Sequence, residues 1–143
     1  MIRDTLDEAV VAMLAAATGK EVGLSKLPPL TNPGDLHPPL PYAVLYALHS
    51  PIGSGGFEDP EEDRDYIYQL TCIGETHKQC AWMSAKILEA FTDRAANGDY
   101  TNPITGSGWY VQWRRSDGLG AILPSGEDLY QSQDTYRIRT GRA

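Results

Sequence analysis

At Gly74 the hydrophobic pattern of this chain changes from alternation to a spacing of three or four residues. Before it, Arg64–Ile73 alternates large apolar residues with others, which predicts a β-strand with one face toward a core. After it, the apolar residues between about Thr76 and about Ala96 lie on one side of a helical wheel, which predicts a long amphipathic helix. A strand followed closely by such a helix favours a sheet covered by helices.

The rest of the chain adds a second helix and further strands. Thr5–Thr18 has an apolar stripe, and Thr5 with Glu8 matches a capping box in which Thr5 is the N-cap. Gly19 is a natural C-terminal stop for this helix. Further strands are predicted at the three segments Pro41–Leu48, Gly108–Arg115 and Asp128–Thr140, with a shorter apolar run at Leu119–Leu123.

Two details of the later strands can be predicted from the pattern. In Gly108–Arg115, Trp109, Val111 and Trp113 should face opposite to Tyr110, Gln112 and Arg114. The sequence Ser116–Gly120 carries the signal of a hairpin turn.

We therefore predict a single α+β domain over residues 1–143. Its sheet is mostly antiparallel with four to five strands, and two helices pack on one side. Two stretches read as loops, a proline-rich one at 19–41 and an acidic, glycine-rich one at 50–63. The first is long for a connection inside a compact domain, so it is either a binding loop or an ordered loop packed through Leu27, Leu30 and Leu36.

Cys72, His77 and Cys80 lie within nine residues and raise the question of a metal or redox site. The cysteines fall on the core faces of the strand and of the helix, where a small buried residue belongs. The spacing has no second ligand pair, and a C-x-x-C sequence is absent. Packing is the favoured interpretation, and a disulfide or a metal site are the alternatives.

No catalytic signature stands out. The run Gly53–Gly56 is followed by acids that would repel phosphate, and His37, His49 and His77 are scattered over different elements. Carboxylates are plentiful, but none forms a distinct pair. We therefore expect no catalytic residue, no cofactor site and no metal site, which makes a non-enzymatic protein the leading interpretation.

The charge is formally −7, from 12 basic and 19 acidic residues. This balance disfavours tight binding to a nucleic-acid backbone, and the segment 58–65 concentrates six of the acids. The sequence has no apolar run long enough to cross a membrane, and its first residues are acidic where a secretion signal would be basic. Two cysteines in such a chain suggest reduced thiols in a cytoplasm.

Trp82 is out of place in the pattern of the second helix. It projects about 150° from the centre of the apolar stripe, and its neighbours on the wheel are Lys86, Glu89 and Asp93. Three interpretations remain open: the proline-rich segment of the same chain covers this tryptophan, another subunit covers it, or it is simply exposed. If a subunit covers it, Trp82, Lys86, Glu89 and Asp93 form an interface, since buried aromatic residues are typical anchors of interfaces.

The stretch "DYIYQLTCIGETHKQCAWMSAKILEAF", a Trp-rich strand and the closing "LYQSQDTYRIRT" resemble the tail terminator proteins of long-tailed bacteriophages, especially those of actinobacterial hosts. The matching pattern covers about Tyr42–Thr140. It consists of ordinary residues, and the proline-rich segment before it has no counterpart. The matching positions are Tyr66, Tyr68, Gln69, Leu70, Thr71, Asp134, Tyr136 and Ile138.

The resemblance implies a structural virion protein that is assembled in the host cytoplasm and lies at the tail–neck junction. Members of that family form six-fold rings that cap the tail tube, stop its growth and join it to the neck. The implied partners are other copies of the chain in a probably hexameric ring, the major tail tube protein and a neck or head-completion protein. DNA would pass through the bore without specific binding. The alternatives are a head–tail connector or tail-completion protein and, in another class, a small-ligand or regulatory binding domain.

Overall fold

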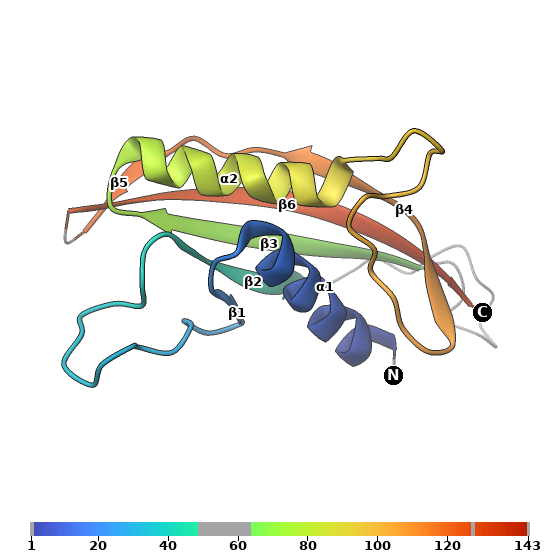
Figure 1. Cartoon of the computed structure of the whole chain (residues 1–143), viewed down its shortest axis with the longest axis horizontal. Helices are drawn as coiled ribbons and strands as arrows, with labels where there is room; N and C mark the ends of the chain where they lie inside the picture. The colour runs from blue at the N-terminus through green and yellow to red at the C-terminus, as the bar shows by residue number, and fades with distance from the viewer. Residues whose placement is uncertain (1, 49–63, 127, 143) are drawn as a thin grey trace.

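The computed structural model describes residues 2–48, 64–126 and 128–142. The residues form two helices and six strands in the order α1 (Ile2–Thr18), β1 (Val22–Leu24), β2 (Tyr42–Leu48), β3 (Arg64–Gly74), α2 (His77–Thr92), β4 (Trp109–Gly118), β5 (Leu123–Ser125) and β6 (Leu129–Arg142). Both helices pack on the same face of the sheet (Figure 1). The predicted α+β class and the placement of the helices are confirmed.

The sheet has the strand order β1-β2-β3-β6-β4, and β5 pairs with β6 outside this path. All of the pairings are antiparallel except that of β1 with β2, which is parallel. The prediction of four to five strands was therefore too low. The additional strands β1 and β5 have three residues each, which is too short for alternation to reveal them.

The core lies between the helices and the sheet, and the long central strands β3 and β6 supply much of it. Their register places Tyr68 beside Tyr136 and Leu70 beside Asp134, all fully buried. The ring of Tyr136 stacks on Phe91 of α2 with the ring centroids 4.2 Å apart. The face of β3 that was predicted to point into the core does so in the structure.

Each helix differs from its predicted extent at one of its two ends. Helix α1 begins at Ile2, so Thr5 lies inside the helix and is not its N-cap. Its hydroxyl instead accepts a hydrogen bond from Trp109 Nε1 at 3.0 Å. Helix α1 ends as predicted at Gly19, whose φ of +69° favours glycine.

Helix α2 is shorter than predicted. It ends at Thr92 rather than near residue 96, and Asp93 follows as an extended C-cap. At the other end, Thr76 caps the helix by accepting a hydrogen bond from the backbone N–H of Gln79. Gly74 allows the tight passage from β3, since a Cβ there would lie 2.5 Å from the backbone nitrogen of Cys80.

In β4, the side-chain faces predicted for the residues after Val111 are wrong. The register of β4 against β6 shifts between Val111 and Trp113. This β-bulge reverses the alternation, so that Trp113 lies on the helix-free face while Arg114 turns to the helix side and becomes buried. The predicted turn at 116–120 is also wrong in its first half, because β4 continues to Gly118.

The proline-rich segment differs from the prediction in two ways. It contains β1, and the three leucines expected to pack on the body, Leu27, Leu30 and Leu36, are exposed, Leu36 to 90%. The segment instead buries Gly23 and three prolines, Pro28, Pro38 and Pro41. Figure 1 shows the segment extending away from the helices at one end of the molecule. The predicted acidic loop, 50–63, lies outside the described residues.

Candidate interaction surfaces

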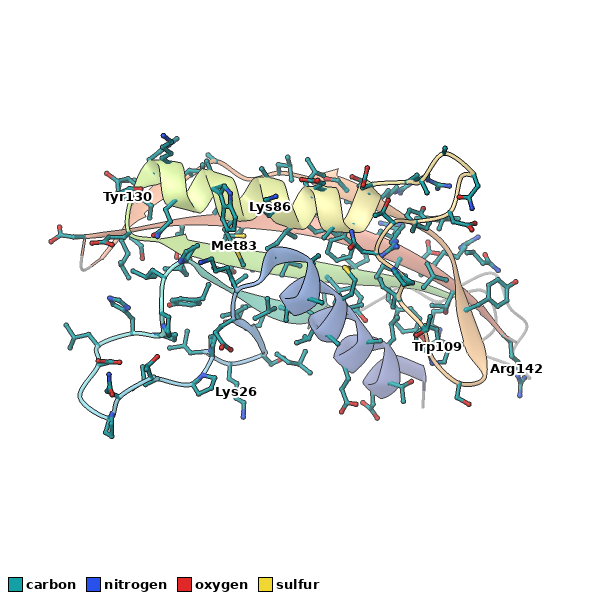
Figure 2. All side chains as sticks on the ribbon, in the orientation of Figure 1. Lys26, Met83, Lys86, Trp109, Tyr130 and Arg142 are labelled. Atoms are coloured by element: carbon teal, nitrogen blue, oxygen red, sulfur yellow. The ribbon has the colours of Figure 1, made fainter. Side chains whose placement is uncertain are left out.

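Trp82 lies on the outer side of α2, away from the core. Its side chain is 40% exposed, whereas Met83, which Figure 2 shows between α2 and the sheet, is fully buried. The ammonium groups of Lys20 and Lys86 each lie 5.8 Å from the centroid of the Trp82 ring. At this distance each cation is attracted to the π face of the ring. Trp82 is therefore neither fully covered by its own chain nor isolated on the surface.

A shallow pocket of about 380 Å³ adjoins the tryptophan. It combines one aromatic ring with two lysine ammonium groups, a chemistry that suits an acidic or π-rich group of a partner. The proline-rich segment contributes only Pro41 to it. The lining residues are Lys20, Pro41, Thr76, Lys78, Gln79 and Trp82.

Three residues of the predicted interface lie along α2, and the fourth, Asp93, follows the last residue of the helix. The structure brings Trp82 and Lys86 together, and it leaves Glu89 and Asp93 exposed farther along the helix. Asp93 also has a local role, because its backbone N–H donates to the Glu89 carbonyl at 2.9 Å. No pattern in the sequence indicated Lys20, which follows the end of α1 and reaches Trp82 from there.

The helix-free face of the sheet carries a second polar surface, formed by β3, β4 and β6. Asp65 pairs with Arg139 at 2.5 Å and with Arg137 at 3.4 Å, and Asp117 pairs with Arg137 at 3.0 Å and with Arg115 at 2.9 Å. Two carboxylates thus connect three guanidinium groups across three strands. Because most of these groups are partly exposed, each pair contributes about 0–1 kcal/mol to stability.

Trp113 lies in this charge network because of the bulge in β4. The guanidinium carbons of Arg115 and Arg139 lie 5.1 and 5.8 Å from the centroid of its ring. The network has one positive charge more than it has negative charges, in a chain that is acidic overall. Such a surface can orient an acidic partner through charge complementarity.

Cys72 and Cys80 are both fully buried and free. The thiol of Cys80 donates to the Cys72 carbonyl at 3.5 Å, and its sulfur lies 3.8 Å from Ser132 Oγ. Burial raises the pKa of both thiols, which keeps them protonated and unreactive at neutral pH. The interpretation of these cysteines as packing residues is confirmed.

The histidines are not brought together in the described part of the chain. His77 opens α2 and meets Tyr130 edge to face at 6.2 Å between ring centroids, while His37 Nδ1 lies 2.8 Å from the Pro38 carbonyl oxygen. His49 and the run Gly53–Gly56 lie outside the described residues. Within residues 2–48, 64–126 and 128–142, no group of three or more His, Cys, Asp or Glu side chains is placed to hold a metal ion.

Over these same residues, neither helix combines the length and apolar character that a bilayer crossing requires.

No protein-family model matches the chain, and no curated protein matches it in sequence. Among solved structures, the fold is similar to that of a chain in the virion of a native gene transfer agent (GTA) particle. The TM-score is 0.61 at 14% sequence identity, and the match covers 96% of this chain and 94% of the other. The two chains therefore share a fold over nearly their whole lengths.

Proposed function

We propose that this chain is a structural protein of a phage-type virion and, more specifically, a tail terminator. It forms a hexameric ring that caps the tail tube, stops its polymerisation and joins it to the neck of the head. The observation that carries the proposal is the end-to-end fold similarity to a chain of a GTA virion. The sequence resemblance to tail terminators points in the same direction.

The described surfaces suit an assembly protein better than an enzyme. The positions that carry the resemblance are mostly core positions: Tyr136 and Ile138, like Tyr66 and Tyr68, point toward the helices and are buried. They specify the fold and leave the contact surfaces free to vary. The outer side of α2 and the charged face of the sheet are then the surfaces available for ring, tube and neck contacts.

The physical requirement for a terminator is asymmetry. A tube grows through head-to-tail contacts that never close along its axis, so it stops only when a subunit offers one compatible face and one incompatible face. The overall acidity of the chain fits a ring whose bore lets DNA pass without binding it, since a basic lining would retain the phosphates.

The proposal is tested with tubes polymerised from the major tail tube protein of the same virion. We expect the purified protein to bind tube ends, as seen by electron microscopy, and to stop elongation at substoichiometric amounts. Native mass spectrometry of the end-bound species should give a closed ring. Binding to DNA-filled heads without binding to tubes would identify a neck or completion protein instead. Binding to neither would contradict a role at the tail–neck junction.

A further inference from the structure

Arg114 is a buried cation that no carboxylate neutralises in the described part of the chain. The bulge in β4 turns it onto the helix side of the sheet, where it is only 5% exposed. No described acidic side chain forms an ion pair with it. Burial lowers its pKa to about 10, so the guanidinium remains charged at neutral pH. A buried, unpaired charge is costly, which makes the surroundings of Arg114 informative.

Two groups contact the guanidinium and hold it in place. Its Nη2 donates to the Asn102 carbonyl, and its plane lies over Tyr100, with the guanidinium carbon 4.1 Å from the ring centroid. The Tyr100 hydroxyl accepts from the backbone N–H of Arg114 at 2.9 Å and donates to its carbonyl at 3.2 Å. Arg94 stacks on the same ring, 4.2 Å from its centroid. Arg114 is thus fixed in position before any ligand arrives.

Two of its nitrogens remain unused. Nε and Nη1 are buried and have no hydrogen-bond partner among the described residues. A guanidinium carries five N–H donors in a rigid plane, so most of its donors are available. A buried donor without a partner costs about 1–3 kcal/mol, and this cost disappears when an acceptor binds.

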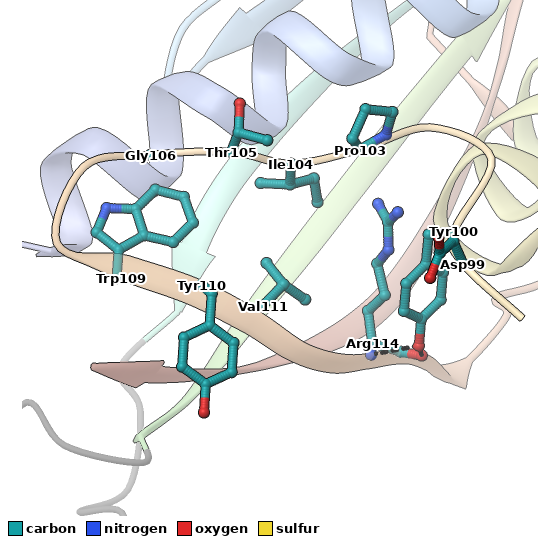
Figure 3. Close-up of a pocket in the computed structure, with 10 residues that line it drawn as sticks. All are labelled: Asp99, Tyr100, Pro103, Ile104, Thr105, Gly106, Trp109, Tyr110, Val111 and Arg114. Atoms are coloured by element: carbon teal, nitrogen blue, oxygen red, sulfur yellow. Dashed lines mark hydrogen bonds between the residues drawn. The ribbon is translucent and has the colours of Figure 1, made fainter. Parts of the chain in front are cut away.

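Arg114 lines a pocket of about 430 Å³, which we call the Arg114 pocket (Figure 3). The segment 99–106 forms one wall and the start of β4 forms the other. Ile104, Trp109 and Val111 make it largely apolar, while the exposed Asp99 and Tyr110 also line it. Its volume is in the range of small-molecule sites, and Figure 3 shows the guanidinium directed toward Ile104 and Pro103.

We propose that the Arg114 pocket binds a carboxylate attached to an apolar group. The carboxylate pairs with the free N–H groups of Arg114, since the planar guanidinium matches it in shape and charge. The apolar group lies against Ile104 and Val111. A phosphate fits less well, because the apolar walls would desolvate its second charge and because Asp99 repels a dianion more strongly than the single charge of a carboxylate. This inference does not depend on the proposed role as a terminator.

The carboxylate could belong to a free organic acid or to an acidic side chain of a second copy, and one experiment addresses both. The full chain, labelled with ¹⁵N, is titrated with phenylacetate, its neutral isostere phenylacetamide and inorganic phosphate. The Nε–H signal of Arg114 and the indole N–H signal of Trp109 are followed by NMR. We expect saturable shifts with phenylacetate, at least tenfold tighter binding than phenylacetamide, and weaker binding of phosphate.

Two substitutions provide the controls. Arg114→Lys keeps a positive charge but loses the planar fork, and it should weaken phenylacetate binding at least fivefold. Arg115→Gln removes the neighbouring cation of β4, which lies on the helix-free face and outside the pocket lining, and it should leave binding unchanged. The proposal is overturned by the absence of saturable shifts, by equal affinity for acid and amide, by tighter binding of phosphate, or by unchanged binding in Arg114→Lys.

Native mass spectrometry at saturating phenylacetate distinguishes the two sources of the carboxylate. If the acid dissociates an oligomer of the chain, the natural carboxylate comes from a second copy. If the oligomeric state does not change while binding is saturable, the pocket takes a free acid. Both results support a carboxylate site.

Discussion

Ser84 of α2 donates a 2.6 Å hydrogen bond to Asp134 Oδ2 of β6, and this bond ties the helix to the centre of the sheet. The other carboxylate oxygen of Asp134 accepts from the backbone N–H of Gly120 at 2.9 Å. Asp134 is fully buried. Both of its oxygens therefore act as acceptors for donors on two different segments, which explains why an acid occupies this position of a core-facing strand.

Replacing Asp134 by Asn should destabilise the protein by about 1–3 kcal/mol. An amide offers only one acceptor oxygen, so its NH₂ group would face either the Ser84 hydroxyl or the Gly120 N–H. Urea unfolding monitored by circular dichroism measures the loss. The double variant with Ser84→Ala should show coupling between the two sites. Gln133→Ala, at the exposed neighbouring position of β6, is the control and should change stability by less than about 0.5 kcal/mol.

Replacing Trp82 by Ala should weaken self-assembly by about 2 kcal/mol or more, which is roughly a thirtyfold change in affinity. The melting temperature of the monomer should hardly change, because the side chain is 40% exposed in the isolated chain. Size-exclusion profiles measured beside thermal melts separate the two effects. Tyr110→Ala, which removes a 50% exposed aromatic ring from β4, is the control.

The opposite outcome has a structural meaning. If the melt of Trp82→Ala falls by many degrees and assembly survives, then the contact with Lys20 and the pocket next to Pro41 serve the stability of the single chain. The predicted interface of Trp82, Lys86, Glu89 and Asp93 would then be wrong.

Deleting Gln112 should remove the bulge in β4 without changing the faces of the residues that follow it. Relative to β6, one extra residue lies between Val111 and Trp113, so its removal leaves Trp113 opposite Arg139 and Arg114 opposite Ile138 in regular pairing. We expect the variant to stay folded and to lose less than about 3 kcal/mol in urea unfolding, because the buried arginine keeps its place on the helix side. Gln112→Ala, which retains the extra residue, is the control. Loss of the fold in the deletion variant alone would show that the bulge itself is required.

The same bulge shows where sequence reasoning stops. Alternation identified the core faces of β3 and β6 correctly, because each strand keeps one period along its described length. In β4 a register shift that depends on pairing with β6 interrupts this alternation. No residue of β4 indicates that shift in the sequence. The faces of Trp113 and Arg114 were therefore assigned wrongly.

The candidate surfaces were partly predictable for a similar reason. The helical wheel identified Trp82 and Lys86 as neighbours, since both lie on α2 and local geometry fixes their spacing. Lys20 comes from a segment 62 positions earlier, and only the packing of α1 beside α2 places it at the ring. The Arg114 pocket could not be predicted, because it needs the bulge and the course of the segment 99–106 together.

Replacing both Cys72 and Cys80 by Ala should cost about 1–3 kcal/mol at neutral pH, the usual range for a small loss of core packing. The fold and the ability to assemble should persist, since both thiols are free and point into the core. Thermal melts and size-exclusion profiles test this. Stoichiometric zinc in the purified protein, with loss of fold on chelation, would contradict the assignment of the thiols to packing.

The two buried thiols should also lower the free energy of unfolding at alkaline pH. Burial, and next the negative charge of Asp134, raise the pKa of Cys72 above its ordinary value of 9.0, and burial raises that of Cys80. Below about pH 9 the thiols are protonated in both the folded and the unfolded chain, so their contribution to stability is fully present. Above it the unfolded chain releases protons that the folded chain retains, and stability falls by up to about 1.4 kcal/mol per pH unit for each thiol.

The free energy of unfolding in urea, measured under reducing conditions between about pH 8 and pH 10, tests this sign. Arg114 acts in the opposite direction only above its lowered pKa of about 10, where the unfolded chain binds the extra proton, so the thiols dominate in the chosen window. Cys72→Ala should flatten the decline by up to about 1.4 kcal/mol per pH unit. If the wild type and Cys72→Ala decline in parallel, Cys72 ionises as readily in the folded chain as in the unfolded one, and its thiol is not held away from water.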